Sequence, residues 1–502
     1  MSRHGRRPFA DSTARDVARR VLGRIGAEQA FTALALDAEL GRADLPERER
    51  KLATELCYGV CRHLSRLDRA VAGAASRGRV RVKPTVRAAL RVGAYQLLFL
   101  DRVPAHAAVD DAVNAARRAG GAKVAGFVNS LLRRLARDGE PALPGTEQSV
   151  EHVQVAHSLP DWIAERLATS LGNGDELLAG AQALNQRPPL GIRCNRTRTD
   201  PDALAEILHK EKSGCAITRS EICPDALLTT GLGDPARSPS FERGMWTVQD
   251  PGAQLVTRFL TGAAFVSDNR PGDRPAVLDA CAGIGGKTLH LCERLGGLID
   301  AADVSQAKLS RLIEAAERLG LAERVRTVVV DLTRPLYAGD SSDDTERVDD
   351  GPGLTADRVY DLVLLDAPCT GLGVMRRHPE VKWRVCAADV DRIADTQRAL
   401  LDRVSQHVRP GGVLVYCVCT FTYEEGPGQV RSFLARHPDF HLHPPPAPSS
   451  ADGPTPEPPW SALACSLTAG APPSPGTLAT WPHRHGADAF FAARLRRRLP
   501  GE

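Results

Sequence analysis

The sequence lacks the features that would place it in a membrane or outside the cell. None of its apolar runs reaches the roughly 20 residues that a membrane-spanning helix needs, and no apolar signal-peptide stretch follows its basic start. Its 12 cysteines include no Cys-x-x-Cys pair, which argues against a zinc ribbon or a thioredoxin-type site, and we expect no metal. We therefore expect a cytoplasmic protein with reduced thiols, in which an unusually placed cysteine serves chemistry.

Charge is unevenly distributed along the chain. The net charge is +4, but residues 1–140 carry 27 Lys and Arg against 15 Asp and Glu, or +12, so the other 362 residues sum to −8. A basic N-terminal third predicts a polyanionic partner, most simply a nucleic acid. The alternative is an arginine-rich composition without a ligand, because only eight lysines accompany 57 arginines.

The length of 502 residues predicts two or three domains. Residues 1–142 are predicted to form amphipathic helices, at 14–40, 47–67, 85–100, 109–118 and 124–137. Residues 143–244 indicate a small α+β unit with helices at 162–171 and 200–210 and strands at 190–195 and 216–220. In residues 245–502, apolar strands at 276–280, 298–303, 325–331, 360–366 and 413–416 alternate with helices, and a last strand lies at 489–495. This alternation is typical of a parallel, doubly wound sheet. Two inserts, 339–357 and 441–475, are predicted to be disordered.

A glycine-rich loop follows the first strand of that sheet. Asp279-Ala-Cys281-Ala-Gly-Ile-Gly-Gly286-Lys287 joins the strand to a helix, where glycines let the backbone approach a ligand and the helix N-terminus favours negative charge. Asp303 and Asp331 close the next two strands, and an acid at the end of the second strand commonly binds a ribose diol. The pattern favours an adenosine-type ligand, although a tight turn with nothing bound fits the loop alone.

Two thiols follow strands later in the chain. Leu364-Leu-Asp366-Ala-Pro-Cys369-Thr-Gly-Leu-Gly373 places an acid and a thiol three residues apart, and Tyr416-Cys417-Val418-Cys419-Thr420 carries the second site. Carbon 5 of cytosine is a poor nucleophile, but addition of a thiolate to carbon 6 makes it an enamine that can attack an electrophilic methyl group. Such covalent catalysis needs an activated cysteine, an acid at the ring nitrogen and a base for the carbon-5 proton. Lys287 can supply positive charge near the acid or the thiolate.

These motifs resemble the RsmB/NOP family of S-adenosylmethionine-dependent RNA cytosine-5 methyltransferases, and within it the bacterial RsmB (Sun/Fmu) group that acts on 16S ribosomal RNA. Further matches are Val248-Gln249-Asp250-Pro-Gly-Ala-Gln254, Arg377-His-Pro-Glu-Val-Lys-Trp383-Arg384 and Gly486-Ala-Asp488-Ala-Phe-Phe491. The helical N-terminal part resembles the NusB-type RNA-binding domain of that group. The resemblance implies a NusB-like domain, a small α+β linker domain and a Rossmann-like class I methyltransferase domain.

The resemblance also implies roles for individual residues. It makes Cys419 the nucleophile, Cys369 the thiol that resolves the adduct and Asp366 the acid at the cytosine ring, with Lys287 beside it. The cofactor-contacting positions it implies are Cys281, Ala282, Gly283, Ile284, Gly285, Gly286, Lys287, Asp303, Asp331 and Asp366. The other cysteines, Cys417 included, are interpreted as small buried hydrophobes. The family's usual Ala-Pro is Gly283-Ile284 here, and its usual Thr before the nucleophile is Val418, which removes a hydroxyl next to Cys419 and is expected to slow the reaction.

RNA recognition is expected to combine arginine-rich faces with extraction of the target base. Candidate contacts are Arg376, Arg377, Lys382 and Arg384. The expected partner is 16S rRNA, free or in early assembly, bound by a monomer. Three alternatives stay open: the same chemistry on another RNA such as tRNA, a DNA cytosine-5 enzyme with Cys369 as nucleophile, and a non-catalytic RNA-binding assembly factor.

Overall fold

The computed structural model describes residues 12–28, 30–75, 78, 80–262, 274–336, 354–445, 460–468 and 470–502. The chain divides into two compact units. The helical unit comprises Met1–Gln186 and Met375–Cys386, and the sheet unit comprises Arg187–Val374 and Ala387–Glu502. The chain therefore leaves the sheet unit once, at residues 375–386, and returns to it.

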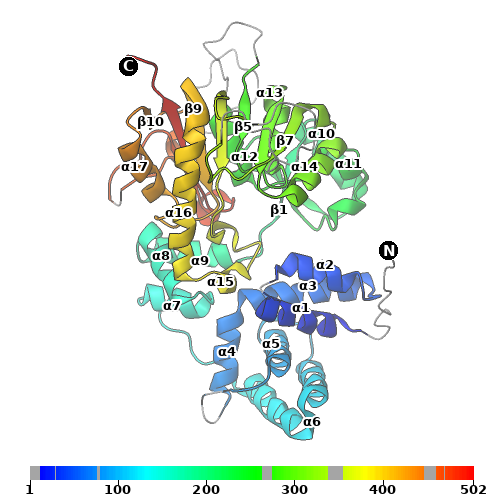
Figure 1. Cartoon of the computed structure of the whole chain (residues 1–502). Helices are drawn as coiled ribbons and strands as arrows, with labels where there is room; N and C mark the ends of the chain where they lie inside the picture. Colours follow the sequence, from blue (N-terminus) through cyan, green and yellow to red (C-terminus); the bar gives the residue numbers. More distant parts are fainter. Residues whose placement is uncertain are drawn as a thin grey trace. The chain divides into compact units, whose positions relative to one another are not determined.

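The helical unit is drawn mostly blue to cyan in Figure 1, and its first six helices pack around one apolar core. Its helices are α1 (Ala14–Glu28), α2 (Thr32–Leu40), α3 (Glu47–Arg62), α4 (Leu64–Gly73), α5 (Pro84–Phe99), α6 (Ala105–Asp138), α7 (Ser149–Ala156), α8 (Asp161–Leu171), α9 (Asp175–Asn185) and α15 (Val381–Arg384). Pro84 opens α5, where a first-turn proline loses no hydrogen bond. α6 is interrupted at Gly121, whose φ of 78° is not helical, so the two helices predicted there are confirmed.

The predicted boundaries differ from the compact units in two respects. Residues 375–386 are predicted to lie in the 245–502 domain but cluster with the helical unit. Residues 143–186 are predicted to belong with the small α+β unit, but α7, α8 and α9 cluster with the helical unit. The predicted long helices at 14–40 and 47–67 are each two helices, broken near Phe31 and at His63. Apolar periodicity runs through both breaks, which is why the pattern alone joins them.

A four-stranded antiparallel sheet begins the sheet unit. Its strands are β1 (Leu190–Cys194), β2 (Ala216–Arg219), β3 (Ala226–Thr230) and β4 (Trp246–Val248), in the order β2-β3-β1-β4. Helix α10 (Pro201–Glu211) packs on it, and the Asp200 carboxylate caps this helix by accepting from the N–H groups of Asp202 and Ala203. A short helix, α11 (Pro239–Glu242), precedes β4.

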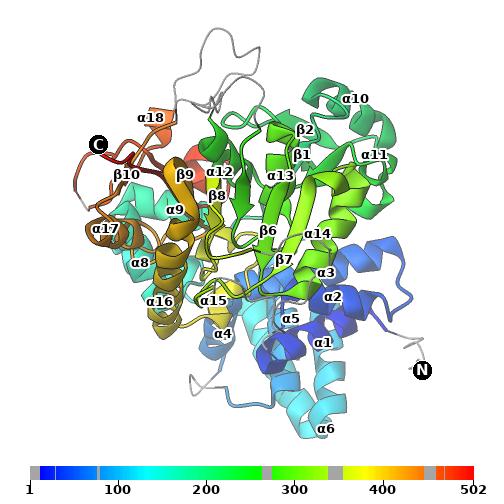
Figure 2. The same cartoon turned by 45° about the horizontal axis from the view of Figure 1, so that its top comes forward.

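The large sheet carries the predicted chemistry (Figure 2). Its order is β10-β12-β9-β8-β5-β6-β7, with β11 paired to β12. The strands are β5 (Val277–Asp279), β6 (Ile299–Asp303), β7 (Val325–Val329), β8 (Tyr360–Asp366), β9 (Val408–Val418), β10 (Phe440–Leu442), β11 (Thr477–Thr480) and β12 (Phe490–Arg497). β5 to β9 are parallel, as predicted, whereas β12 runs antiparallel to β9, β10 and β11. The sheet is therefore mixed.

Helices cover both faces of this sheet because its central strands are apolar on both sides. One apolar cluster joins the sheet to α12 (Pro251–Thr261), α13 (Gly286–Leu295) and α14 (Gln306–Leu319), and the other joins it to α16 (Ala387–Val404) and α17 (Pro427–Arg436). Shorter helices are α18 (Trp460–Leu463), α19 (Pro482–His485) and the 3₁₀ turns Pro235–Arg237, Ala322–Arg324, Leu372–Val374 and Ser405–His407. None of the described helices is long and apolar enough to cross a membrane.

The second predicted insert is shorter than expected. Residues 441 and 442 belong to β10, and α18 packs into the sheet's core, with Leu463 buried and the Trp460 ring 5.3 Å from that of Phe259. Local composition misses this ordering because the apolar partners lie far away in sequence. Residues 339–353 of the first insert and 446–459 of the second lie outside the described residues.

Candidate active site

The two predicted thiols lie together at the carboxyl ends of β8 and β9. Cys369 is in the loop after β8 and Cys419 directly follows β9, and their sulfur atoms are 3.1 Å apart. The hydrogen bond between them and burial raise the pKa of Cys369 well above its ordinary value. Cys369 is therefore protonated at neutral pH and can donate its S–H to the sulfur of Cys419.

A glycine allows the Cys369 loop to approach the end of β9. The Gly373 N–H donates to the Cys419 carbonyl at 3.0 Å, and the Gly373 carbonyl accepts from Ala489 at 3.1 Å. A side chain at Gly373 would overlap both the Ala489 and the Cys419 carbonyls. The second glycine of the thiol motif thus has a packing reason.

An ion pair lies beside the thiols. Lys287 Nζ is 2.5 Å from Asp366 Oδ2, and Cys417 Sγ donates to Asp366 Oδ1 at 3.3 Å. Burial opposes the charged form of Lys287, but the Asp366 carboxylate outweighs it and raises the pKa of this lysine. The structure thus brings Lys287, Asp366, Cys369 and Cys419 into one site, as the sequence predicts.

Cys417 is buried, as predicted, but it also contacts Asp366, which the sequence reasoning missed. In the parallel register of β8 and β9, Asp366 lies opposite Cys417, which is why the thiol reaches this carboxylate. Cys417 and Cys419 pack in one apolar cluster and Val418 in the other, on opposite faces of the sheet. The effect of Val418 on the rate of the reaction stays a prediction.

The glycine-rich loop is held by Asp303, at the end of the neighbouring strand β6. Gly283 and Gly285 have φ values of 57° and 86°, which glycine adopts without strain. The Gly283 N–H donates to Asp303 Oδ2 at 2.9 Å, and Ser305 donates to the other Asp303 oxygen. Asp331 follows β7 and accepts from both Thr333 donors, which lower the pKa of Asp331.

Asp279, at the end of β5, is buried and only partly satisfied. Its Oδ2 accepts from the Thr288 hydroxyl at 2.7 Å, whereas Oδ1 accepts no well-formed hydrogen bond from the described residues. Burial raises the pKa of Asp279 to about 7, although Thr288 and the nearby Cys281 N–H lower it. A buried carboxylate oxygen without a well-formed hydrogen bond makes ionisation of this group costly.

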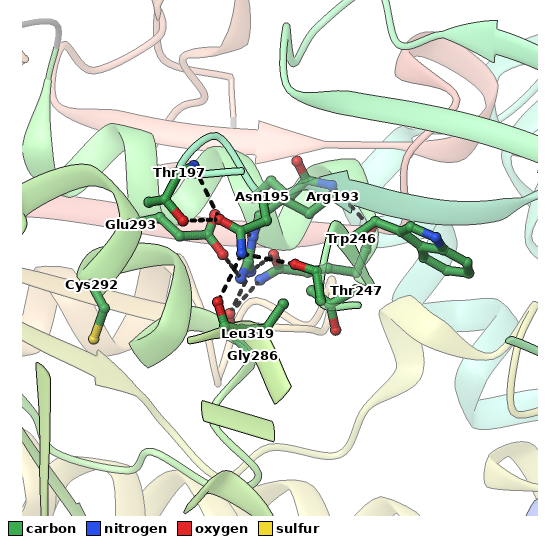
Figure 3. A network of polar contacts seen from close by, with 12 residues as sticks. Arg193, Asn195, Thr197, Trp246, Thr247, Gly286, Cys292, Glu293 and Leu319 are labelled. Atoms are coloured by element: carbon green, nitrogen blue, oxygen red, sulfur yellow. Dashed lines mark hydrogen bonds and ion pairs between the residues drawn. The ribbon is translucent and has the colours of Figure 1, made fainter. Parts of the chain in front are cut away.

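Arg193, on β1, holds the first residue of α13, and nothing in its local sequence pointed to this role. Figure 3 shows its side chain among Glu293, on α13, and Gly286. The guanidinium donates to both Glu293 oxygens, at 2.7 and 3.1 Å, to the Gly286 carbonyl at 2.8 Å and to the side-chain oxygen of Gln249. Gln249 donates to the same Gly286 carbonyl, so one residue of the Val248–Gln254 motif helps to hold the glycine loop.

The predicted RNA contacts at residues 376–384 need a correction. Lys382 is 1% exposed, and its ammonium donates to Asn185 Oδ1 and to the carbonyls of Arg62 and His157, all within the helical unit. Burial and the Arg62 charge lower the pKa of Lys382 well below its ordinary value. Arg376 is buried as well. Neither side chain can reach a phosphate from this position. These two residues therefore contribute to packing and do not contact RNA.

Arg377 and Arg384 are half-buried. The Arg384 guanidinium lies 3.7 Å from the centre of the Phe31 ring, a cation–π contact. Their RNA contacts stay predictions. The helical unit offers a larger basic surface on α6, where six basic side chains are exposed: Arg117, Arg118, Lys123, Arg133, Arg134 and Arg137.

The fold and the site together define a Rossmann-like domain with a cofactor loop and a thiol pair at the carboxyl ends of its strands. Comparison with known families gives the class. The model for "16S rRNA methyltransferase RsmB/F" matches residues 266–496, that for the NusB family matches 12–137, and that for the ferredoxin-like domain of RsmF/B-like methyltransferases matches 159–232.

Individual relatives agree. A Mycobacterium tuberculosis protein is 36% identical over 98% of both chains. Ribosomal RNA small subunit methyltransferase B is 33% identical in Vibrio cholerae, over 79% of this chain and 83% of that protein, and 31% identical in Klebsiella pneumoniae, over 90% and 91%. A solved crystal structure superposes with a TM-score of 0.72 at 25% identity, over 97% of this chain and 99% of its own.

The chain belongs to the RsmB/F family of 16S rRNA methyltransferases, whose cofactor is S-adenosylmethionine. The resemblance seen in the sequence is thereby confirmed, as are its three-part fold and its cofactor.

Proposed function

We propose that this protein methylates carbon 5 of a cytosine in 16S ribosomal RNA through a covalent bond between Cys419 and carbon 6. The observation that carries the proposal is the juxtaposition of two thiols 3.1 Å apart with the Lys287–Asp366 ion pair. Methyl transfer to an oxygen or an exocyclic nitrogen has no use for a thiol pair, whereas carbon 5 must first be activated by addition of a nucleophile.

The residues of the glycine loop fit S-adenosylmethionine. Residues 281–287 form the loop, and Asp303 and Asp331 offer carboxylate acceptors at the ends of β6 and β7. Ile284 and Val304 are 60% and 63% exposed, so apolar surface is available on the loop and beside Asp303 for an adenine ring. When bound, the cofactor supplies the electrophilic methyl group.

The addition step uses Cys419 and Asp366. A lone pair of the Cys419 thiolate forms the bond to carbon 6, and the electrons of the carbon 5–carbon 6 double bond become available at carbon 5. The S–H of Cys369 stabilises the thiolate before it reacts. The ring nitrogen takes up the proton that the Cys419 thiol gives up. Asp366, which is 32% exposed, can accept a hydrogen bond from this N–H, which holds the added state.

The release step uses Cys369. The hydrogen bond and the charge of Cys419 are among the causes that keep the pKa of Cys369 high. Once Cys419 is bonded to carbon 6 as a neutral thioether, both causes are gone, and Cys369 gives up its proton to solvent more easily. Its thiolate then removes the proton from carbon 5, the freed electron pair restores the double bond, and the electrons of the carbon–sulfur bond return to Cys419.

The helical unit is proposed to bind the RNA. The exposed arginines of α6 provide a basic surface in a domain of the NusB family. Contacts of this kind neutralise phosphates and depend on salt, while the base itself must leave its stack to reach the thiols.

The test is transfer of labelled methyl from S-adenosylmethionine to deproteinised 16S rRNA, with tRNA and DNA offered in parallel. Label is expected in 5-methylcytosine of the rRNA. Cys419→Ser should abolish transfer, and Cys369→Ser should trap a protein–RNA adduct that survives denaturing electrophoresis. Cys386→Ser, which changes an exposed thiol outside the site, is the matched control and should behave as wild type.

Each contrary result has a distinct meaning. Full activity in Cys419→Ser would overturn the nucleophile, and label in DNA with an adduct through Cys369 would point to the DNA enzyme. Label confined to tRNA would change the substrate. No label in any nucleic acid, from protein that binds the cofactor, would leave an assembly factor.

A further inference from the structure

A buried carboxylate lies directly behind the thiol pair. Glu425 is in the loop between β9 and α17 and is 0% exposed. Its Oε1 accepts from the Thr370 N–H at 2.8 Å and from Gln397 Nε2 at 3.2 Å. Its Oε2 accepts from the hydroxyls of Thr370, at 2.6 Å, and of Thr422, at 2.7 Å.

These contacts join the two thiol-bearing loops. Thr370 directly follows Cys369 and Thr420 directly follows Cys419, and their hydroxyl oxygens are 3.1 Å apart. Gln397, on α16, also donates to the carbonyl of Pro368, on the other side of Cys369. The main chain of Glu425 is held in turn, because the buried Tyr416 hydroxyl donates to its carbonyl at 2.5 Å.

We propose that Glu425 is a positioning residue that sets the separation of Cys369 and Cys419. The inference rests on the proposed function for its catalytic meaning, but the geometry it concerns is that of the two loops alone. The charge of Glu425 also contributes, after the Cys419 hydrogen bond and burial, to the raised pKa of Cys369. Glu425 thus favours the protonated form of the thiol that must donate to Cys419.

A carboxylate is required because of the number of donors. Two carboxylate oxygens offer about four acceptor positions, and four donors reach Glu425. Glutamine has the same shape but replaces one oxygen with an NH₂ group that faces donors. Glu425→Gln should therefore preserve the volume of the side chain while breaking part of the link between the loops.

The chain offers a matched control. Glu211, near the small antiparallel sheet, also accepts from one N–H and two hydroxyls: the Ser240 N–H at 2.8 Å and the hydroxyls of Ser238 and Ser240 at 2.6 and 2.9 Å. It is 15% exposed and also pairs with Arg243 at 3.6 Å. Glu211→Gln makes the same chemical change outside the thiol loops.

The experiment measures how readily the two thiols meet. An azodicarboxamide such as diamide takes two electrons and two protons from a pair of thiols and leaves one disulfide and the reduced hydrazine. The rate of Cys369–Cys419 disulfide formation is followed in the full-length protein by mass spectrometry of the linked peptides, with Cys369→Ser as the blank. We expect about a tenfold slower reaction in Glu425→Gln, because the two loops no longer hold the thiols in reacting geometry. Glu211→Gln should react at the wild-type rate.

A second variant tests the proposal if Glu425→Gln does not fold. Thr370→Val is isosteric and removes only the hydroxyl that joins Glu425 to Thr420, so an intermediate slowing is expected if Glu425→Gln fails to fold. In methyl transfer, Glu425→Gln should lower kcat and leave the KM for S-adenosylmethionine unchanged, which general damage to the fold would not do.

A wild-type disulfide rate in both Glu425→Gln and Thr370→Val would overturn the proposal. If wild type transfers no methyl group to any RNA while disulfide formation still depends on Glu425, the proposed function fails and the positioning role stands. If wild type transfers methyl groups, and Glu425→Gln changes neither the rate of methyl transfer nor that of disulfide formation, only the positioning role fails.

Discussion

Replacing Asp279 with asparagine is expected to stabilise the cofactor-free protein at and above neutral pH. Asp279 is 1% exposed, and one of its oxygens lacks a well-formed hydrogen bond from the described residues. Burial raises its pKa to about 7 from an ordinary 3.8. The folded protein must therefore ionise a carboxylate that water stabilises better in the unfolded chain.

The sign and size follow from proton linkage. Between about pH 4 and pH 7 the unfolded chain has released the Asp279 proton while the folded chain still holds it, so this group lowers the free energy of unfolding as pH rises. At about 1.4 kcal/mol for each pH unit, the loss approaches about 4 kcal/mol and levels off above pH 7. An asparagine side chain cannot ionise. The free energy of unfolding of Asp279→Asn should therefore rise relative to wild type between about pH 4 and pH 7, and the difference should persist above pH 7.

The assay is urea unfolding of both proteins without cofactor, from about pH 5 to pH 8. Asp225→Asn is the matched control, because Asp225 is equally buried but pairs with Arg258 at 2.6 Å. Breaking that pair should destabilise the protein by about 3–5 kcal/mol. Parallel pH dependence of wild type and Asp279→Asn would refute the reasoning. The same variant should bind S-adenosylmethionine more weakly, since it loses an acceptor oxygen beside Thr288 and the Cys281 N–H of the loop.

Two further predictions concern the cofactor loop and the RNA. In Arg193→Lys, the lysine cannot bind Glu293 and Gly286 together, so S-adenosylmethionine binding measured by calorimetry should weaken about tenfold. Arg326→Lys alters the ion pair with Asp300 and should leave the affinity unchanged. Equal affinities in the two variants would show that Arg193 does not hold the cofactor loop. Arg133→Gln should reduce the slope of RNA affinity against salt concentration by about one phosphate contact. Lys382→Met should leave that slope unchanged, because Lys382 is buried. A reduced slope in Lys382→Met would show that Lys382 does contact the RNA.

Much of the site was accessible from the sequence because it is carried by local motifs. Asp366 and Cys369 are three residues apart, and the loop around Gly283 and Gly285 sits between a strand and a helix. Parallel strands bring their carboxyl ends to one edge of the sheet, so residues after successive strands meet there. The same logic predicts that Lys287 lies near Asp366.

Other contacts could not be predicted in this way. Cys417 touches Asp366 only because the register of β8 and β9 sets them opposite each other. Arg193 reaches Glu293 across 100 positions of the chain, and Glu425 reaches Thr370 across 55. No local period encodes such pairs, because packing of distant elements decides them.

Periodicity and motifs act over a few residues, and they were enough to predict the class of fold, the cofactor loop and the thiol pair. Which charges are buried and which carboxylates hold the loops depended instead on the packing of the whole chain. Lys382 looks like a surface charge in its basic segment, yet it lies in the helical unit with Asn185 and two carbonyls as its acceptors. Burial depends on what packs against a side chain, and that is a property of the whole fold.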